Sequence, residues 1–251
     1  MIKYFDINAA GHSIRCKLFG NKPRDYKAVV LCGHGFAGHK DNRSTERFAE
    51  TLLSKYKQTA VLIFDWPGHG KDVKKHLTLQ DCDTYLSLVL DYVRAQMGVA
   101  TIYGYANSFG GYLFLKYIHE HGNPFEKIAF RCPAIGIYDS MLTRILQPSD
   151  LEKLQNGKDA LVGFDRKTNI NALFLEGIHT ADVRTYDYMD ECEKMIIIQG
   201  TKDEIVDYEE VKAFAENNLI DFIPIANADH RFQDYTAMGN VIREVIQFFF
   251  V

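Results

Sequence analysis

A serine, a carboxylate and a histidine occur in that order along the chain, and each directly follows a segment that is typical of a β-strand. The three residues are Ser108, Asp203 and His230, and the strands before them are residues 99–105, 194–199 and 219–225. A serine hydroxyl needs a general base at neutral pH, and a histidine base needs a carboxylate that fixes its tautomer. This order predicts a nucleophile, an acid and a base for acyl transfer.

The acid has two rivals, Asp207 and Asp229, which stand near Asp203 and His230. Asp203 is preferred because it lies in the turn directly after a strand, whereas Asp207 is placed to cap the next helix. Among nine histidines, His230 alone follows a late strand, so it is the predicted base.

Ser108 stands in Ala106-Asn107-Ser108-Phe109-Gly110, which approximates the Gly-x-Ser-x-Gly turn between a strand and a helix. Small residues two places on either side are needed because strand and helix cross closely there. Gly110 meets this need, and Ala106 exceeds it by one methyl group.

The loop 33–38, Gly-His-Gly-Phe-Ala-Gly, follows another apolar run. An oxyanion formed on a carbonyl is usually held by two backbone N–H groups, one from such a loop and one from the residue after the nucleophile. Phe36 and Phe109 are the predicted donors. We expect His34 to brace the loop, and we expect Asp65 and His69 in the next glycine-rich turn to have structural roles.

Short apolar strands interleaved with amphipathic helices position these residues. A hairpin is expected at 2–8 and 13–19, further strands at 28–32, 60–64 and 127–132, and helices from about 44 and at 78–97, 110–121, 207–217 and 235–249. Such interleaving predicts an α/β fold with a mostly parallel sheet, covered by helices on both faces and edged by the antiparallel hairpin.

Residues 134–192 break this alternation, so one domain over 1–251 is expected, with an insertion that forms a cap or lid. The insertion carries apolar side chains that would suit a medium or aromatic acyl group, although residues of this kind more often pack a cap onto the core. They are Tyr138, Met141, Leu142, Phe164, Phe174, Leu175 and Ile178.

Composition limits the partners and the compartment. The 251 residues carry a net charge of −4 with both signs interspersed, which argues against nucleic acid. The apolar runs are far shorter than the roughly 20 residues of a membrane helix, and the start of the sequence lacks an export signal. Five cysteines without a Cys-x-x-Cys pair indicate free thiols in a reducing cytoplasm. The oligomeric state is not predicted.

Five ordered segments, GHGFAGHKDN, DWPGHG, YANSFGG, GTKDEIV and NADHRF, resemble motifs of the α/β-hydrolase superfamily. Within it, the chain is similar to feruloyl (cinnamoyl) esterases and to serine-aminopeptidase-like (S33-type) and monoacylglycerol-lipase-like hydrolases. The resemblance implies an eight-stranded sheet, a cap between Pro133 and about Glu193, and hydrolysis of a small-molecule ester through an acyl-serine. It also matches Ser108, Asp203 and His230 to the triad, whereas most relatives carry glycine in place of Ala106.

The sequence favours a serine hydrolase that acts on esters. Three other functions have some support in its motifs. Gly33-x-Gly35-x-x-Gly38 matches a dinucleotide fingerprint, but the acidic Asp65 stands too far along the chain and the helix starts too late. A non-catalytic binding protein and an amide or peptide hydrolase remain open. No His-Glu-x-x-His pattern or comparable set of metal ligands is present in the sequence. Neither a cofactor nor a metal is therefore expected.

Overall fold

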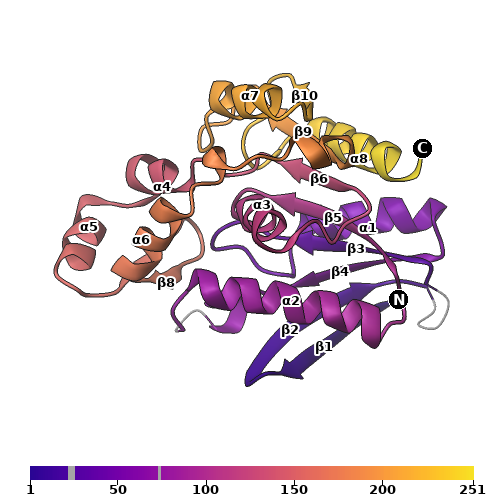
Figure 1. Cartoon of the computed structure of the whole chain (residues 1–251), viewed down its shortest axis with the longest axis horizontal. Helices are drawn as coiled ribbons and strands as arrows, with labels where there is room; N and C mark the ends of the chain where they lie inside the picture. The colour runs from indigo at the N-terminus through magenta and orange to yellow at the C-terminus, as the bar shows by residue number, and fades with distance from the viewer. Residues whose placement is uncertain (22–25, 73–74) are drawn as a thin grey trace.

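The computed structural model describes residues 1–21, 26–72 and 75–251, and an eight-stranded sheet runs through it (Figure 1). The strand order is β1-β2-β4-β3-β5-β6-β9-β10. Strand β2 pairs antiparallel with both β1 and β4, and every other neighbouring pair is parallel. The predicted mostly parallel sheet with an antiparallel edge hairpin is therefore confirmed.

The strands of this sheet are β1 (Ile2–Ala9), β2 (His12–Phe19), β3 (Ala28–Gly33), β4 (Thr59–Phe64), β5 (Thr101–Asn107), β6 (Ile128–Arg131), β9 (Met195–Gly200) and β10 (Asp221–Ile225). The helices that pack against it are α1 (Arg43–Lys55), α2 (Leu79–Ala95), α3 (Phe109–His121), α7 (Tyr208–Asn217) and α8 (Tyr235–Phe250).

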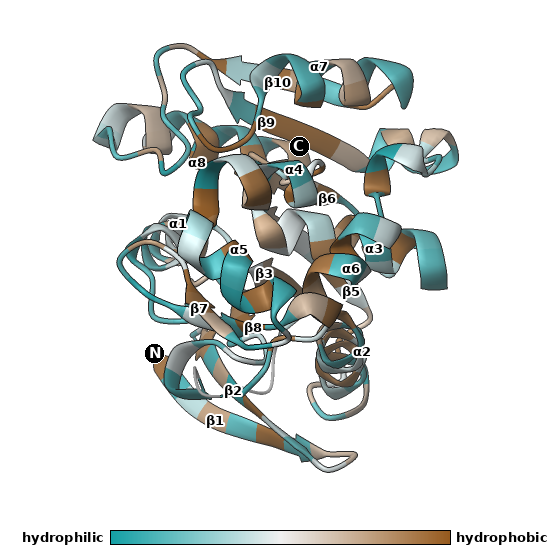
Figure 2. Ribbon diagram, turned by 90° about the vertical axis from the view of Figure 1, so that its left-hand side faces the viewer, coloured by the Kyte–Doolittle hydropathy of each residue, from teal (hydrophilic) through white to brown (hydrophobic). Residues whose placement is uncertain are grey.

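Two apolar layers hold these helices on opposite faces of the sheet. One layer joins the sheet to α2, α3 and α7, and the other joins it to α1 and α8. Alternate residues of β3 illustrate this, because Val29 and Leu31 face the first layer while Val30 and Cys32 face the second. In Figure 2, β9 is hydrophobic over most of its length, whereas α7 on the surface carries mostly hydrophilic residues. Burial on both faces explains why these strands do not alternate in polarity.

Strand β5 was predicted two residues too early at both ends, and strand β10 two residues too early at its start. Strand β5 begins at Thr101 rather than at 99, because the Val99 N–H donates to the Val93 carbonyl at the end of α2. Strand β10 begins at Asp221 rather than at 219, because Leu219 lies at φ 56° in the turn that ends α7. Helix α2 runs over Leu79–Ala95, two residues shorter at its end than the predicted 78–97, and Thr78 caps it by accepting from the Asp81 N–H.

Residues 132–194 form a separate group of elements between β6 and β9. They are α4 (Ile137–Ser140), a π-turn at Met141–Ile145, α5 (Pro148–Gln155), the antiparallel pair β7 (Ala160–Val162) and β8 (Thr168–Ile170), α6 (Ala172–Thr180), and two short 3-10 turns at Val183–Thr185 and Met189–Lys194. Figure 1 places α4, α5, α6 and β8 beyond the arrowheads of the parallel strands. The β7–β8 pair was not predicted.

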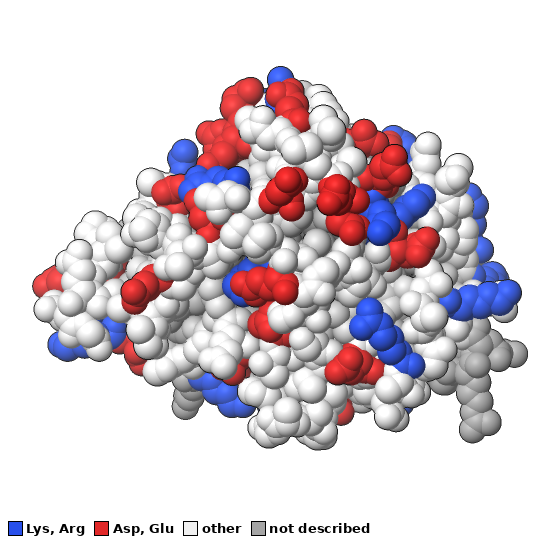
Figure 3. All heavy atoms as spheres, viewed as in Figure 1, with Lys and Arg blue, Asp and Glu red and all other residues white. Residues whose placement is uncertain are grey.

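Among the described residues, no helix combines the length and the apolar character that crossing a bilayer requires. Acidic and basic side chains lie interspersed over the face shown in Figure 3. All five cysteines are free, as predicted, and Cys32 and Cys132 are buried. The cytoplasmic location stays a prediction.

Candidate functional site

Ser108 occupies a tight turn between β5 and α3. Its backbone lies at φ 52° and ψ −122°, outside the regions that L-residues ordinarily adopt. A Cβ on Gly110 would lie 2.6 Å from the Gly33 carbonyl oxygen and 2.8 Å from that of His34. Only glycine therefore allows α3 to start this close to β3, which explains the small residue predicted at this place.

The methyl group of Ala106 is accommodated because it faces another glycine. Ala106 pairs with Gly33 of β3. A Cβ built on Gly33 would lie 3.4 Å from that of Ala106 and 3.0 Å from the Phe114 ring. Since Gly33 has no side chain, the two strands keep their spacing, and the departure from Gly-x-Ser-x-Gly is compatible with the turn.

The structure brings the three predicted side chains into one hydrogen-bonded chain at the carboxyl ends of β5, β9 and β10. The Ser108 Oγ lies 3.0 Å from His230 Nε2, and His230 Nδ1 lies 2.8 Å from Asp203 Oδ2. With its proton on Nδ1, His230 donates to the carboxylate and can accept from the hydroxyl. This arrangement can move a proton from Ser108 to His230.

The side chain of Asp203 is fully buried and is surrounded by donors. Its Oδ2 also accepts from Gln199 Nε2 at 2.9 Å, and its Oδ1 accepts from the N–H groups of Ile205 and Val206 at 2.9 and 2.8 Å. Burial by itself raises the pKa of this carboxyl group, but the bond from His230, its charge and the backbone donors outweigh that effect. The pKa of Asp203 therefore lies below its ordinary value, and the carboxylate stays ionised at neutral pH.

The two rival acids have other roles. Asp207 caps α7, where its Oδ1 accepts from the Glu210 N–H. The Oδ1 of Asp229 accepts from the Gln233 N–H. Asp203 is the only carboxylate among the described residues that forms a hydrogen bond with the His230 ring.

Two backbone N–H groups beside Ser108 have no acceptor within the described part of the chain: those of Phe36 and Phe109. The neighbouring N–H groups of the loop are engaged. The Gly38 N–H donates to the Gly35 carbonyl. In the orientation of the Asn107 amide that lets its NH₂ donate to the Gly33 carbonyl, its oxygen accepts from the Gly35 N–H. Phe109 is also the first residue of α3, where the helix dipole favours negative charge. The predicted oxyanion donors are thus left free.

Two buried histidines brace this loop. His34 Nδ1 donates to the Gly35 carbonyl, and its Nε2 accepts from the Trp66 N–H at 3.3 Å. His69 Nδ1 donates to the Pro67 carbonyl, and its Nε2 accepts from the Ala37 N–H at 3.0 Å. His34 thus braces the loop as predicted, and the structural role expected of His69 is the support of Ala37.

These histidines should make stability depend on pH. Burial lowers the pKa of His34 to about 4 and that of His69 to about 3. Below pH 6.5 these two histidines are protonated in the unfolded chain but stay neutral in the folded one. The free energy of unfolding should therefore fall as the pH drops from 6.5 to about 4. Each histidine contributes up to about 1.4 kcal/mol per pH unit in that window. Urea unfolding at pH 7, 6 and 5 measures this slope.

His69→Gln is the matched control, because the glutamine oxygen can still accept from Ala37 but cannot take up a proton. It should flatten the slope measured in the wild-type protein by about one histidine's share. An unchanged slope in this variant would contradict the assignment.

Ser108 and His230 open onto a cavity of about 610 Å³. The loop around Phe36 forms one wall, and the loop between β7 and β8 forms another through Phe164, Asp165 and Arg166. Of the apolar side chains expected to surround an acyl group, Phe164 lines the cavity, while Met141, Phe174 and Ile178 are buried in the core.

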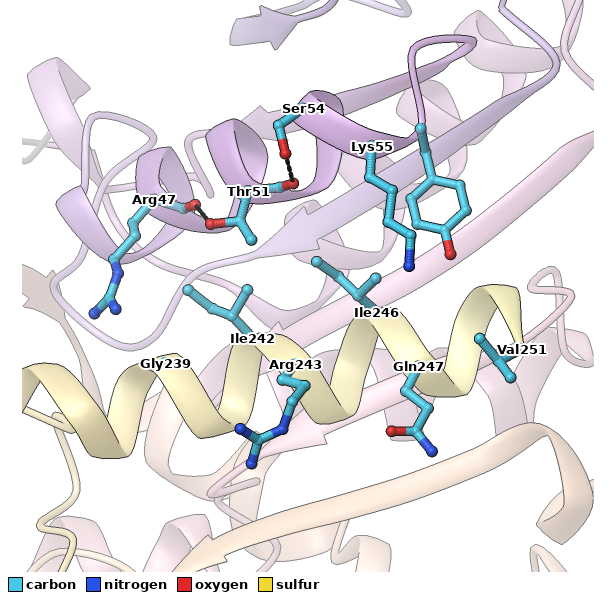
Figure 4. Close-up of a pocket in the computed structure, with 11 residues that line it drawn as sticks. Arg47, Thr51, Ser54, Lys55, Gly239, Ile242, Arg243, Ile246, Gln247 and Val251 are labelled. Atoms are coloured by element: carbon cyan, nitrogen blue, oxygen red, sulfur yellow. Dashed lines mark hydrogen bonds between the residues drawn. The ribbon is translucent and has the colours of Figure 1, made fainter.

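A second cavity, about 490 Å³, lies between α1 and α8. Figure 4 shows Ile242 and Ile246 of α8 on its lower side, facing α1. It contains none of the predicted site residues.

Arg131 also lines the cavity of Ser108, and sequence reasoning missed it. It is the last residue of β6 and is only 5% exposed. The available signal was Arg131 itself, the one charge in the apolar run 128–132, because a strand buried on both faces rarely carries an arginine.

No described group of residues favours a metal or dinucleotide. Cys132 lies near Asp203 and His230, but those two groups already bond to each other, and burial raises the pKa of the Cys132 thiol. In the set Asp83, Glu120 and His121, His121 Nε2 already forms a hydrogen bond with Asp83 Oδ1 at 2.9 Å. Helix α1 begins at Arg43, well after the fingerprint glycines, so its N-terminus does not meet them as a pyrophosphate site requires.

Solved structures share this architecture over nearly the whole chain. Est1E from Butyrivibrio proteoclasticus, solved also with ferulic acid bound, has a TM-score of 0.77 and 21% identity, covering 98% of this chain and 97% of its own. A putative hydrolase from Agrobacterium vitis S4 has a TM-score of 0.79, 16% identity and 99% coverage of both chains. Alpha/beta hydrolase domain-containing protein 10 from mouse has a TM-score of 0.73, 14% identity and 98% coverage of both.

These likenesses show a shared α/β-hydrolase fold. No curated protein matches the chain significantly by sequence. The family model described as "Serine aminopeptidase, S33" matches residues 24–162, which is more than half of the chain and includes Ser108 and the loop of Phe36. The chain therefore belongs to the S33 serine aminopeptidase family of α/β hydrolases.

Proposed function

We propose that the protein is a serine carboxylesterase that cleaves small or aromatic acyl esters. The observation that carries this proposal is the hydrogen-bonded chain from Ser108 through His230 to Asp203, open to the cavity at its serine end. The esterase neighbours, among them a structure with ferulic acid bound, support ester chemistry on this fold.

In the proposed reaction, Ser108 Oγ attacks the ester carbonyl carbon while His230 Nε2 takes the hydroxyl proton. The N–H groups of Phe36 and Phe109 then hold the oxyanion. Collapse of the tetrahedral intermediate breaks the bond to the alcohol, which takes the proton from His230. Water, activated by the same ring, hydrolyses the acyl-serine and restores the hydroxyl.

Residues 134–192 complete the proposal as a cap on a single domain. Their contribution to the cavity is the loop that joins β7 to β8, together with Ile145. Arg231, next to His230, bonds to Asp165 at 2.9 Å and lies over the Phe164 ring at 5.4 Å. These contacts join the cap to the loop of the base across the mouth of the cavity.

An uncharged fluorophosphonate probe tests the proposal directly. We expect rapid labelling of the folded protein at one site, with the label on the peptide that contains Ser108, because only a serine paired with a base attacks phosphorus readily. Folded protein that never reacts would indicate a binding protein instead.

A substrate panel then separates esters from amides. It contains p-nitrophenyl esters, hydroxycinnamate methyl esters and aminoacyl naphthylamides, and we expect turnover of the esters. Turnover of the naphthylamides alone would replace the esterase with an aminopeptidase while leaving the triad intact.

A further inference from the structure

Arg131 is a buried cation at the edge of the proposed catalytic centre. Its side chain lies in the layer between the sheet and α8, and its carbonyl accepts from the Ser108 N–H at 3.1 Å. The guanidinium donates to Met238 Sδ at 3.5 Å and lies 5.6 Å from the Phe232 ring, with the phenol of Tyr105 beside it. All of these neighbours are neutral.

Such a position is costly for a permanent charge. The Nε atom of Arg131 is buried without a hydrogen-bond partner, and no carboxylate of the described residues lies within ion-pair distance of its guanidinium. Removal of a guanidinium from water is unfavourable unless an opposite charge and well-aligned acceptors replace the lost hydration. Within the described chain, no opposite charge does so, and the guanidinium has only neutral neighbours such as the weak acceptor Met238 Sδ.

The cavity supplies the place where they can bind, because Arg131 lines it together with Ser108 and His230. The remaining charges nearby do not neutralise Arg131. Asp165 is paired with Arg231, and Glu204 accepts from the His230 N–H at 3.2 Å. Arg166 adds another cation to the wall. The cavity is thus lined by the buried Arg131, and its other charged lining residues balance as two cations, Arg166 and Arg231, and two carboxylates, Asp165 and Glu204.

We propose that Arg131 binds a carboxylate of the substrate, so that the preferred substrates are esters that also carry a free carboxylate. This inference rests on the proposed esterase function. A guanidinium offers a planar fork that matches a carboxylate with two parallel hydrogen bonds. One buried cation balances a single negative charge, which favours a carboxylate over a phosphate dianion.

Matched substrates test this inference. Monomethyl succinate, glutarate and adipate each carry a methyl ester and a carboxylate, and their ester amides keep the size but lose the charge. We expect the wild-type protein to prefer the acids by about 10–100-fold in kcat/KM, the range of a charged hydrogen bond. Methyl phosphonoalkanoates of equal length, as dianions, should be poorer substrates than the acids.

Arg131→Met removes the charge and keeps most of the volume. We expect the preference for acids over amides to disappear, while Tm stays constant or rises because an unpaired buried charge is lost. Arg131→Lys should restore part of the preference without the bidentate fork. Arg243→Met on the exposed side of α8 is the matched control, and it should leave both preference and Tm unchanged.

Fluorophosphonate labelling separates failure of this inference from failure of the proposed function. If Ser108 is labelled but the protein shows no preference for acids, or Arg131→Met keeps the preference, the inference is wrong and the esterase remains. If the wild-type protein is not labelled, the change in Tm on addition of glutarate tests whether Arg131 binds a carboxylate. A rise in the wild-type protein that Arg131→Met abolishes supports the carboxylate site, and equal behaviour of the two proteins overturns it.

Discussion

Ser108→Ala is expected to lower kcat for ester hydrolysis by about 10⁶-fold, the loss typical when a triad nucleophile is removed. Among the described residues, the Ser108 hydroxyl is the only hydrogen-bond partner of His230 Nε2, at 3.0 Å. Alanine leaves the backbone turn and the oxyanion donors in place, so no other group takes over the attack. Steady-state hydrolysis of a p-nitrophenyl ester measures the loss, and the fluorophosphonate label should vanish with it.

Ser87→Ala is the matched control for this prediction. Its hydroxyl donates to the Tyr117 hydroxyl at 3.2 Å between α2 and α3, and it does not line the cavity. The same atom is removed in both variants, so any general effect of losing a serine hydroxyl is shared. Activity above about 1% of wild type in a rigorously purified Ser108→Ala protein would exclude Ser108 as the nucleophile.

Asp203→Asn should reduce kcat by about 10⁴-fold with little change in overall structure. Both oxygens of Asp203 face donors only, namely His230 and Gln199 on one side and the backbone of Ile205 and Val206 on the other. If the asparagine side-chain oxygen still accepts from the N–H groups of Ile205 and Val206, the asparagine NH₂ group faces His230 Nδ1. The ring must then accept at Nδ1 and carry its proton on Nε2, where it cannot receive the proton of Ser108.

Two further variants test whether Asp203 is the right acid. Asp207→Asn and Asp229→Asn change the other two candidates, which bond to the N–H groups of Glu210 and Gln233. We expect each to change kcat less than about five-fold, because surface substitutions of this kind have small effects. Circular dichroism should be the same for all three variants. A larger loss in either control than in Asp203→Asn would reassign the acid.

Much of the fold could be predicted because short buried strands and amphipathic helices leave different periodicities. The starts of β5 and β10 were misplaced because the sequence does not distinguish an apolar residue that pairs in the sheet from one that lies in the preceding turn. Val99 and Leu219 do the latter, since their N–H groups donate to the carbonyls of Val93 and Glu216 in the turns that end α2 and α7. The pair β7–β8 escaped because three residues per strand are too few to establish a period.

The candidate site divides in the same way. Ser108, Asp203 and His230 could be proposed because each follows a strand, and parallel strands bring their carboxyl ends to one edge. The role of Arg131 could not, because it depends on which side chains surround it. A sequence shows that an arginine interrupts an apolar run, but only packing shows that Met238 and Phe232 surround it without a carboxylate.

The strand order has a consequence for how the protein is made. Ser108 and the loop of Phe36 belong to inner strands from the first half of the chain, whereas His230 follows β10, an edge strand that pairs with β9 alone. During synthesis, the nucleophile turn can therefore fold on the ribosome well before its base exists. On the proposed mechanism, the nascent chain would carry a hydroxyl without its base, and hydrolysis is expected only once β10 has paired with β9.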